Sequence, residues 1–212
     1  MSNNTAKPSA EKVIVNIENF VFSLEENMKP LKILFNENEI RARLRTLFKE
    51  FGWKFIDSGS FAQVYESPCA QYALKVNFDR DHYSYFAQMA ISQPKNPYLP
   101  NIYWHVLPVN VDDIDAERLI QSVTLMELLE PMERADIQYD EPLADFLKDL
   151  DESCKSPKCH YIDGAVGDIA RGFAEISEFV DLEFDLYDDT IGFSYSNIMY
   201  RYDQLVITDP IA

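Results

Sequence analysis

The stretch that decides the fold is 61-FAQVYESPCAQYALKVNF-78. Polar and apolar residues alternate in its two halves, which are rich in aromatic and β-branched side chains, as strands are. Ser67 and Pro68 interrupt the alternation between the halves, and both residues are typical of turns. The preceding segment, 53–59, has the same strand character. We therefore expect an antiparallel meander of three strands from Trp53 to Phe78.

A glycine flanked by serines precedes this stretch, in the order Gly59, Ser60 and Phe61. Because glycine lets another group approach the backbone closely, such a loop can fold over a phosphate and offer it N–H groups. A hairpin turn with one glycine is the other interpretation, and it is the commoner one. The loop alone leaves both open.

Lys75 stands on the third expected strand, and its neighbours Leu74 and Val76 are expected to point to the opposite face. A single lysine on a strand is usually solvated along the surface. The alternative is a lysine that holds an anion, and the strand pattern by itself does not choose between the two.

Helices are expected before the meander. Residues 1–10 form a polar arm, and 11–52 form a helical segment in which apolar residues recur at helical spacing in two stretches. In the second stretch the recurring residues are Ile40, Leu44, Leu47 and Phe51. Asn36 or Asn38 is expected to cap that helix, and Gly52 to end it.

After the meander we expect a short helix at 81–91, a strand at 120–129, and helices at 140–150 and 163–180. The final segment, 193–210, is expected to form a hairpin. Strands and helices are segregated along the chain, which indicates an α+β fold with two lobes.

Two polar residues of the expected hairpin, Asn197 and Asp209, are candidates for a metal site. An amide and a carboxylate on adjacent strands can converge on one hard cation, because oxygen ligands suit Mg²⁺. A pair of polar side chains that caps a turn is the plainer interpretation.

The net charge of the 212 residues is −17, from 19 basic and 36 acidic side chains. This charge disfavours direct binding to nucleic acid and to anionic membranes, since both carry phosphates. It is compatible with a partner protein that has a basic surface, with imitation of a nucleic acid, or simply with solubility. The acidic run at 180–189 could dock a basic partner, or it could be a solvated helix end.

The three cysteines form no disulfide framework, and the spacing of Cys154, Cys159 and His160 is unlike common zinc sites. We find no signal peptide at the start of the sequence and no run of 18 apolar residues. The expectation is a cytoplasmic protein.

The order of these pieces resembles that of a protein kinase, from Phe55 to Asp209: a glycine loop, a strand lysine, a strand that ends at a glutamate, a long helix, an asparagine and an aspartate. The chain resembles most the early serine/threonine kinases of short-tailed lytic coliphages, and if a phage encodes it the expected location is the cytoplasm of the host cell. The segments that carry the resemblance are SGSFAQVY, ALKV, LPNIYW, SNIMY and VITDP.

The resemblance implies a kinase-like small lobe at 53–128 and a reduced, truncated large lobe at 129–212. It implies that ATP and Mg²⁺ bind, weakly, with Lys75 and Asp209 within about 5 Å of one another. Asn197 and Asp209 would be the metal ligands. The implied nucleotide-binding residues are Gly59, Ser60, Phe61, Lys75, Met126, Glu127 and Leu129.

The chain departs from the kinase pattern at several positions. Gly192 stands where the catalytic aspartate is expected, five residues before Asn197. Asp57 and Ala62 replace two loop glycines, and no glutamate lies between Lys75 and Glu117 to pair with the lysine. These departures favour a pseudokinase that modulates a host protein by binding. The alternatives are an active kinase that phosphorylates host proteins, and an acidic mimic of nucleic acid that blocks a host enzyme acting on DNA or RNA.

Overall fold

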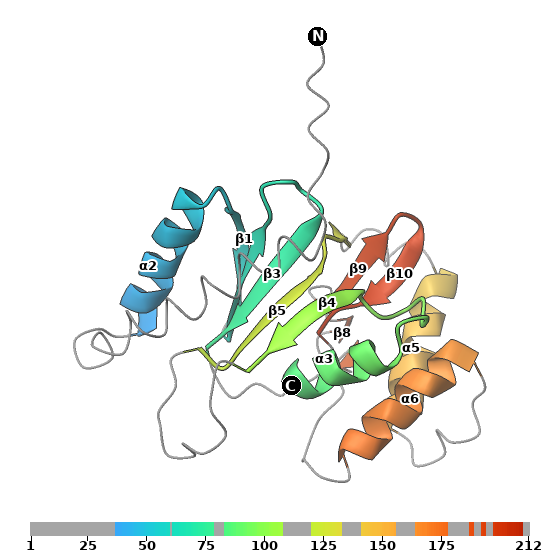
Figure 1. The fold of residues 1–212 in the computed structure, drawn as a ribbon. Coiled ribbons are helices and arrows are strands. Elements are labelled where there is room, and N and C mark those ends of the chain that lie inside the picture. The colour runs from blue at the N-terminus through green and yellow to red at the C-terminus, as the bar shows by residue number, and fades with distance from the viewer. Residues whose placement is uncertain are drawn as a thin grey trace. The chain divides into compact units, whose positions relative to one another are not determined.

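The alternating segments of the sequence form antiparallel strands in the computed structural model, and the periodic segments form helices, so the fold is α+β as expected (Figure 1). The structure describes residues 37–59, 61–78, 83–107, 120–132, 141–155, 164–177, 187–188, 192–193 and 197–209. The expected arm at 1–10 and the first part of the helical segment, to residue 36, lie outside these ranges.

The chain divides into two compact units. Unit 1 contains Met1–Arg80 and Tyr103–Leu128, and unit 2 contains Asp81–Ile102 and Leu129–Ala212. The division at Leu128 falls where the sequence places the boundary between the lobes, but residues 81–102 group with the second unit instead of the first.

Unit 1 is built on a five-stranded sheet in the order β1-β2-β3-β5-β4 (Figure 1). The meander expected from the sequence forms its first three strands, and the next two continue the sheet on the other side of β3. The strands are β1 Lys54–Ser58, β2 Ala62–Glu66, β3 Tyr72–Asn77, β4 Ile102–Val106 and β5 Ser122–Glu127.

One face of this sheet packs against helix α2, Glu37–Glu50. Ile40, Leu44 and Phe48 lie four residues apart on the helix and are at most 2% exposed. They contact a cluster that includes Leu74 of β3 and Leu125 of β5, which are directly opposite one another across the strands. Spacing of four residues keeps a helical stripe on one side, so this stripe covers the sheet face.

The apolar stripe that the sequence predicts for α2 is wrong at its last residue, Phe51. Phe51 is 59% exposed, because the helix ends one residue earlier and Phe51 lies in the turn that follows. Gly52 ends the helix as expected: its φ is +80°, its N–H donates to the Lys49 carbonyl, and the Trp53 N–H donates to the Phe48 carbonyl. Asn38 lies inside the helix and therefore does not cap it, whereas Asn36 lies outside the described residues.

Unit 2 contains the other three described helices and two small sheets (Figure 1). The helix α3 packs against α6, and α6 packs against α5. The helices are α3 Tyr83–Ser92, α5 Glu141–Lys155 and α6 Gly164–Ser177. The strands are β6 Glu130–Pro131, β7 Tyr187–Asp188, β8 Gly192–Phe193, β9 Ile198–Arg201 and β10 Gln204–Ile207.

The hairpin expected at the end of the chain is present as β9 and β10, joined by the two-residue turn Tyr202–Asp203. Tyr202 has a φ of +56°, and two-residue hairpin turns need such a positive φ. The segment after α3 holds the hairpin in place. The Arg201 guanidinium donates to the Pro97 and Leu99 carbonyls, and the Ile207 N–H donates to the Tyr98 carbonyl.

Candidate functional site

Lys75 lies on β3, in the middle of the unit 1 sheet, and only 6% of it is exposed. Its side of the strand is opposite to that of Leu74 and Val76, which face α2, so it lies on the second face of the sheet. Every residue of β3 is buried, including those on the second face. The usual solvated lysine does not describe this residue, because a lysine is rarely buried without a specific reason.

The strand register places small and apolar residues around Lys75. Val64 of β2 and Thr124 of β5 stand directly opposite it. Ala73, two residues before it on the same face, stands opposite Met126, and both are under 10% exposed. An ammonium beside a flat apolar surface is an arrangement that suits a ligand with a phosphate and a planar ring.

The sequence interpretation included Met126 but missed Val64 and Ala73. Alternation gives Ala73 the same face as Lys75, so that signal was present in the sequence. Val64 could not be found in this way, because its position depends on how β2 and β3 are paired, and Val64 pairs with Lys75 only in the observed register.

A histidine of β4 reaches the same face. The Nδ1 of His105 lies 2.8 Å from the hydroxyl oxygen of Thr124, the residue opposite Lys75. Burial lowers the pKa of His105, so its ring is neutral at neutral pH. Its Nε2 is buried and has no hydrogen-bond partner among the described residues. Sequence reasoning did not single out His105, since β4 itself was not anticipated.

Backbone hydrogen bonding at the end of β5 continues past Glu127, the last residue of the strand. Glu127 stands opposite Tyr72, and the Leu128 N–H donates to the Gln71 carbonyl at 3.0 Å. Glu127 and Leu129 are both partly exposed, and Leu129 is already the first residue of this part of unit 2. The Leu128 N–H is thus engaged within the protein and is not offered to a ligand.

The glycine loop is open around Gly59, since a Cβ built there would meet no atom within 4 Å. The Gly59 carbonyl accepts a hydrogen bond from the guanidinium of Arg41, at 3.1 Å. Phe61 is 50% exposed, and Ser60 lies outside the described residues. A nearby guanidinium suits a phosphate, whereas Asp57 in the same loop opposes one. The loop geometry therefore leaves both interpretations of the sequence open.

Asn197 and Asp209 are brought to the same end of the β9–β10 hairpin in unit 2. The Thr208 N–H donates to the Asn197 carbonyl at 2.8 Å, which places Asp209 one residue beyond that pair. The Thr208 hydroxyl beside them is buried and has no partner among the described residues. One amide, one carboxylate and a spare hydroxyl make an oxygen-rich end, and this donor set fits Mg²⁺.

The described part of the chain holds no cluster of three or more His, Cys, Asp or Glu residues suited to a metal ion. That finding does not bear on the predicted pair, because asparagine and threonine are not among those four residue types.

Gly192 lies on β8, and the register of β7 with β8 places Asp188 directly opposite it. Asp188 lies four residues before Gly192 along the chain, so it is out of register with the expected catalytic position in the sequence. Pairing across the two strands brings their backbones together, which a linear comparison of motifs does not detect.

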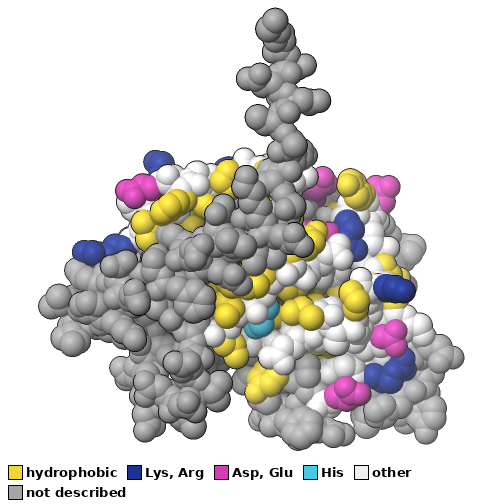
Figure 2. All heavy atoms as spheres, viewed as in Figure 1, with side chains coloured by type: hydrophobic (Ala, Val, Ile, Leu, Met, Phe, Trp, Pro, Cys, Tyr) yellow, Lys and Arg dark blue, Asp and Glu magenta, His cyan; other side chains and the backbone are white. Residues whose placement is uncertain are grey.

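Acidic side chains do not form one continuous row on the face of the described residues that Figure 2 shows, where they are interspersed with basic and hydrophobic ones. Most of the acidic run at 180–189 lies outside the described residues, as do Cys159 and His160. Of the helices that the structure describes, none has both the length and the hydropathy needed to cross a membrane.

Comparison with known protein families and with curated protein sequences finds no match for this chain.

Proposed function

We propose that this chain is a kinase-like pseudokinase that binds ATP with Mg²⁺ weakly and modulates a host protein with a basic surface by binding to it. The order of elements supports the proposal. A helix, α3, follows the third strand of an antiparallel sheet, and the candidate metal ligands stand on a hairpin near the end of the chain. In protein kinases the nucleotide lysine also stands on the third strand.

The observation that carries the proposal is the burial of Lys75 beside Ala73, Val64 and Met126. A lysine that only needed solvation would lie at the surface, whereas only 6% of Lys75 is exposed. A phosphate beside this ammonium and an adenine against the apolar residues would use both features of the sheet face. Asn197 and Asp209 are the proposed ligands of the Mg²⁺.

Phosphoryl transfer is expected to be impaired for two reasons. Gly192 has no side chain to orient an acceptor hydroxyl, and positioning of that kind is worth about 10²–10⁴ in rate. Helix α3 carries no glutamate that could pair with Lys75, as the kinase mechanism requires. Binding without efficient transfer is the function that remains.

Calorimetry of the full chain with ATP, with and without Mg²⁺, tests the nucleotide site. The variant Lys75→Met should abolish binding, whereas Lys54→Met should leave it unchanged. Lys54 is a matched control because it stands on β1 of the same sheet, is largely exposed, and pairs only at the surface with Glu66. Asp209→Asn should remove the Mg²⁺ dependence. ATP binding that is equal in all three variants would refute the site, provided that circular dichroism shows each variant to be folded.

Binding to the partner is tested separately, with the double variant Lys75→Met and Asp209→Asn. We expect the double variant to capture the same partner from a host extract as the native chain does. Capture of the partner should weaken as the salt concentration rises. If the double variant loses both the partner and its effect on the host, the protein acts through its nucleotide chemistry.

An active kinase is the second candidate, and the pairing of Asp188 with Gly192 favours it. The backbone of Asp188 is paired with that of Gly192, so Asp188 is the aspartate to test for the role that Gly192 cannot fill. Incubation with radiolabelled ATP, Mg²⁺ and host extract would then label host proteins. Labelling that disappears in Asp188→Asn and persists in Asp203→Asn, an exposed aspartate of the hairpin turn, would establish this candidate.

A further inference from the structure

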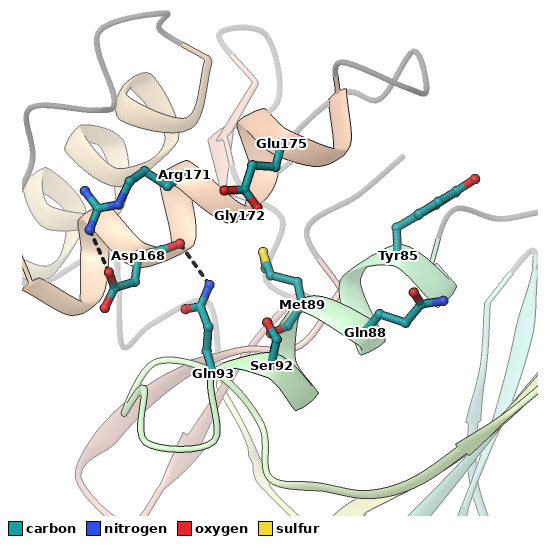
Figure 3. A pocket seen from close by; sticks show the side chains of 9 residues that line it. All are labelled: Tyr85, Gln88, Met89, Ser92, Gln93, Asp168, Arg171, Gly172 and Glu175. Carbon is teal, nitrogen blue, oxygen red and sulfur yellow. Dashed lines mark hydrogen bonds and ion pairs between the residues drawn. The ribbon is translucent and has the colours of Figure 1, made fainter.

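A groove between α3 and α6 in unit 2 has no role in the nucleotide site. Its volume is about 330 Å³, at the lower end of the range of ligand pockets, and side chains from both helices line it (Figure 3). The lining residues of each helix recur at spacings of three and four, so each helix presents one continuous stripe to the groove.

The floor of the groove is fixed by a close approach of the two helices at Gly172. A Cβ built on Gly172 would lie 2.8 Å from Cγ and Sδ of Met89 and 3.0 Å from Nε2 of Gln93. The same Gln93 amide donates to the Asp168 carbonyl at 2.9 Å, and Asn96 donates to the Ala165 carbonyl at 2.8 Å. These contacts hold the helices together, so the groove is preformed.

The charges that line the groove leave one carboxylate without a counter-ion. Asp168 and Arg171 pair with each other at 2.6 Å. Glu175 stands four residues after Arg171 on α6, yet the Arg171 guanidinium turns to Asp168 (Figure 3). Among the described residues Glu175 makes no ion pair or hydrogen bond, and it is exposed. The groove therefore carries a net charge of −1 from these three side chains.

We propose that this groove binds an arginine side chain of the basic partner protein. Glu175 supplies the carboxylate for the guanidinium, and the partly exposed ring of Tyr85 supplies an aromatic wall. Met89, which fills the space over Gly172, also lines the groove and is the apolar contact for the aliphatic part of the arginine. A planar guanidinium can stack and pair at the same time, which a lysine ammonium does less well.

This inference deepens the proposed function, because it names the surface and the side chain through which a basic partner is recognised. It does not depend on the nucleotide site, since none of the nucleotide or metal candidates lines the groove.

The test uses the full chain with ¹³C-labelled methionine methyl groups, and the Met89 resonance, assigned with Met89→Leu, reports occupancy of the groove. The probe is N-acetyl-arginine methylamide, whose capped ends represent an arginine within a protein. We expect a saturable shift with a dissociation constant on the order of millimolar, as for a single exposed charge pair with stacking. The neutral citrulline analogue and the lysine analogue should bind at least about 5-fold more weakly.

The variant Glu175→Gln should weaken arginine binding at least about 5-fold, and Glu152→Gln should change it less than about 2-fold. Glu152 is an exposed glutamate on α5 in the same unit, so both variants remove one charge. An unshifted Met89 resonance, or equal effects of the two variants, would overturn the inference. Equal binding of the lysine analogue would also overturn the assignment to arginine, and binding of free arginine but not of the capped probe would indicate a small-molecule site. If the groove does not bind the arginine probe but the chain still captures its partner, this inference is wrong and the proposed function stands.

Discussion

Replacing Gly172 by alanine is expected to destabilise unit 2 through one identifiable contact. The added Cβ would lie 2.8 Å from two side-chain atoms of Met89, closer than nonbonded carbon atoms approach, and Met89 is only 5% exposed. Overpacking of this kind costs about 1–3 kcal/mol. Alanine also gains about 1 kcal/mol over glycine inside a helix. The net loss in the free energy of unfolding is therefore about 0–2 kcal/mol.

The double variant tests the cause of that loss. Met89→Ala alone should cost about 2–5 kcal/mol, because it removes a buried side chain and leaves a cavity. When both substitutions are present, the Cβ at position 172 enters the space that the methionine left. The loss in the free energy of unfolding in the double variant should then be smaller than the sum of the two single losses by more than about 1 kcal/mol, as expected for residues in contact.

Urea denaturation followed by far-ultraviolet circular dichroism is the suitable assay, since three of the four described helices are in unit 2. Both tryptophans, Trp53 and Trp104, lie in unit 1, so fluorescence reports that unit separately. The dichroism transition should shift in the variants more than the fluorescence transition does, if the units unfold independently. Additive effects in the double variant would refute the close contact between Gly172 and Met89.

Three further changes test the fold. Leu74→Ala should destabilise unit 1 by about 2–5 kcal/mol in urea denaturation, because Leu74 is 0% exposed; a loss below 1 kcal/mol would contradict its place in the core. Tyr202→Asn should raise the free energy of unfolding by about 0.5–1 kcal/mol, because Tyr202 is 86% exposed and has a positive φ that asparagine tolerates better; a lower melting temperature would count against it. Burial holds the pKa of His105 below its ordinary value of 6.5, so the stability that its neutral ring contributes is complete above that pH and decreases as the pH falls. The variant His105→Gln should flatten this decrease in the free energy of unfolding between pH 7 and 5. An unchanged slope would show that another group titrates.

Local patterns predicted the elements whose character is set by nearby residues. The meander, α3, the two later helices and the final hairpin all have a clear period of two or of 3.6 residues, and each is found where the sequence placed it. Strand β4 was missed because Pro100 and Asn101 precede it and because its apolar residues are not regularly alternating. The two-residue strands β6, β7 and β8 are too short to carry any period.

The burial of side chains was harder to predict, because it depends on contacts between segments that are distant in sequence. Phe51 fits the apolar pattern of α2 as well as Leu47 does, yet Leu47 packs against the core, whereas Phe51 lies beyond the end of the helix and is 59% exposed. Lys75 was expected at one face of a strand, and the sequence had no means to show that it is buried there. The partners of Lys75 across the sheet, Val64 and Thr124, follow from strand register, which no local pattern specifies.

The long-range anchoring of the final hairpin has a consequence for the order in which the chain can fold during its synthesis. Arg201 binds carbonyls that precede it by 104 and 102 residues, and β10 bonds to the same early segment. Unit 1 is complete once Leu128 has left the ribosome, but α3 and the segment after it belong to unit 2 and must wait for residues 198–207. During that interval the apolar side of α3, with Phe86, Ala87 and Ala90, lacks part of its final packing. A nascent chain of which only the first 150 or so residues have left the ribosome would therefore carry a finished sheet and an exposed helix, and exposed apolar surface of this kind is what chaperones recognise.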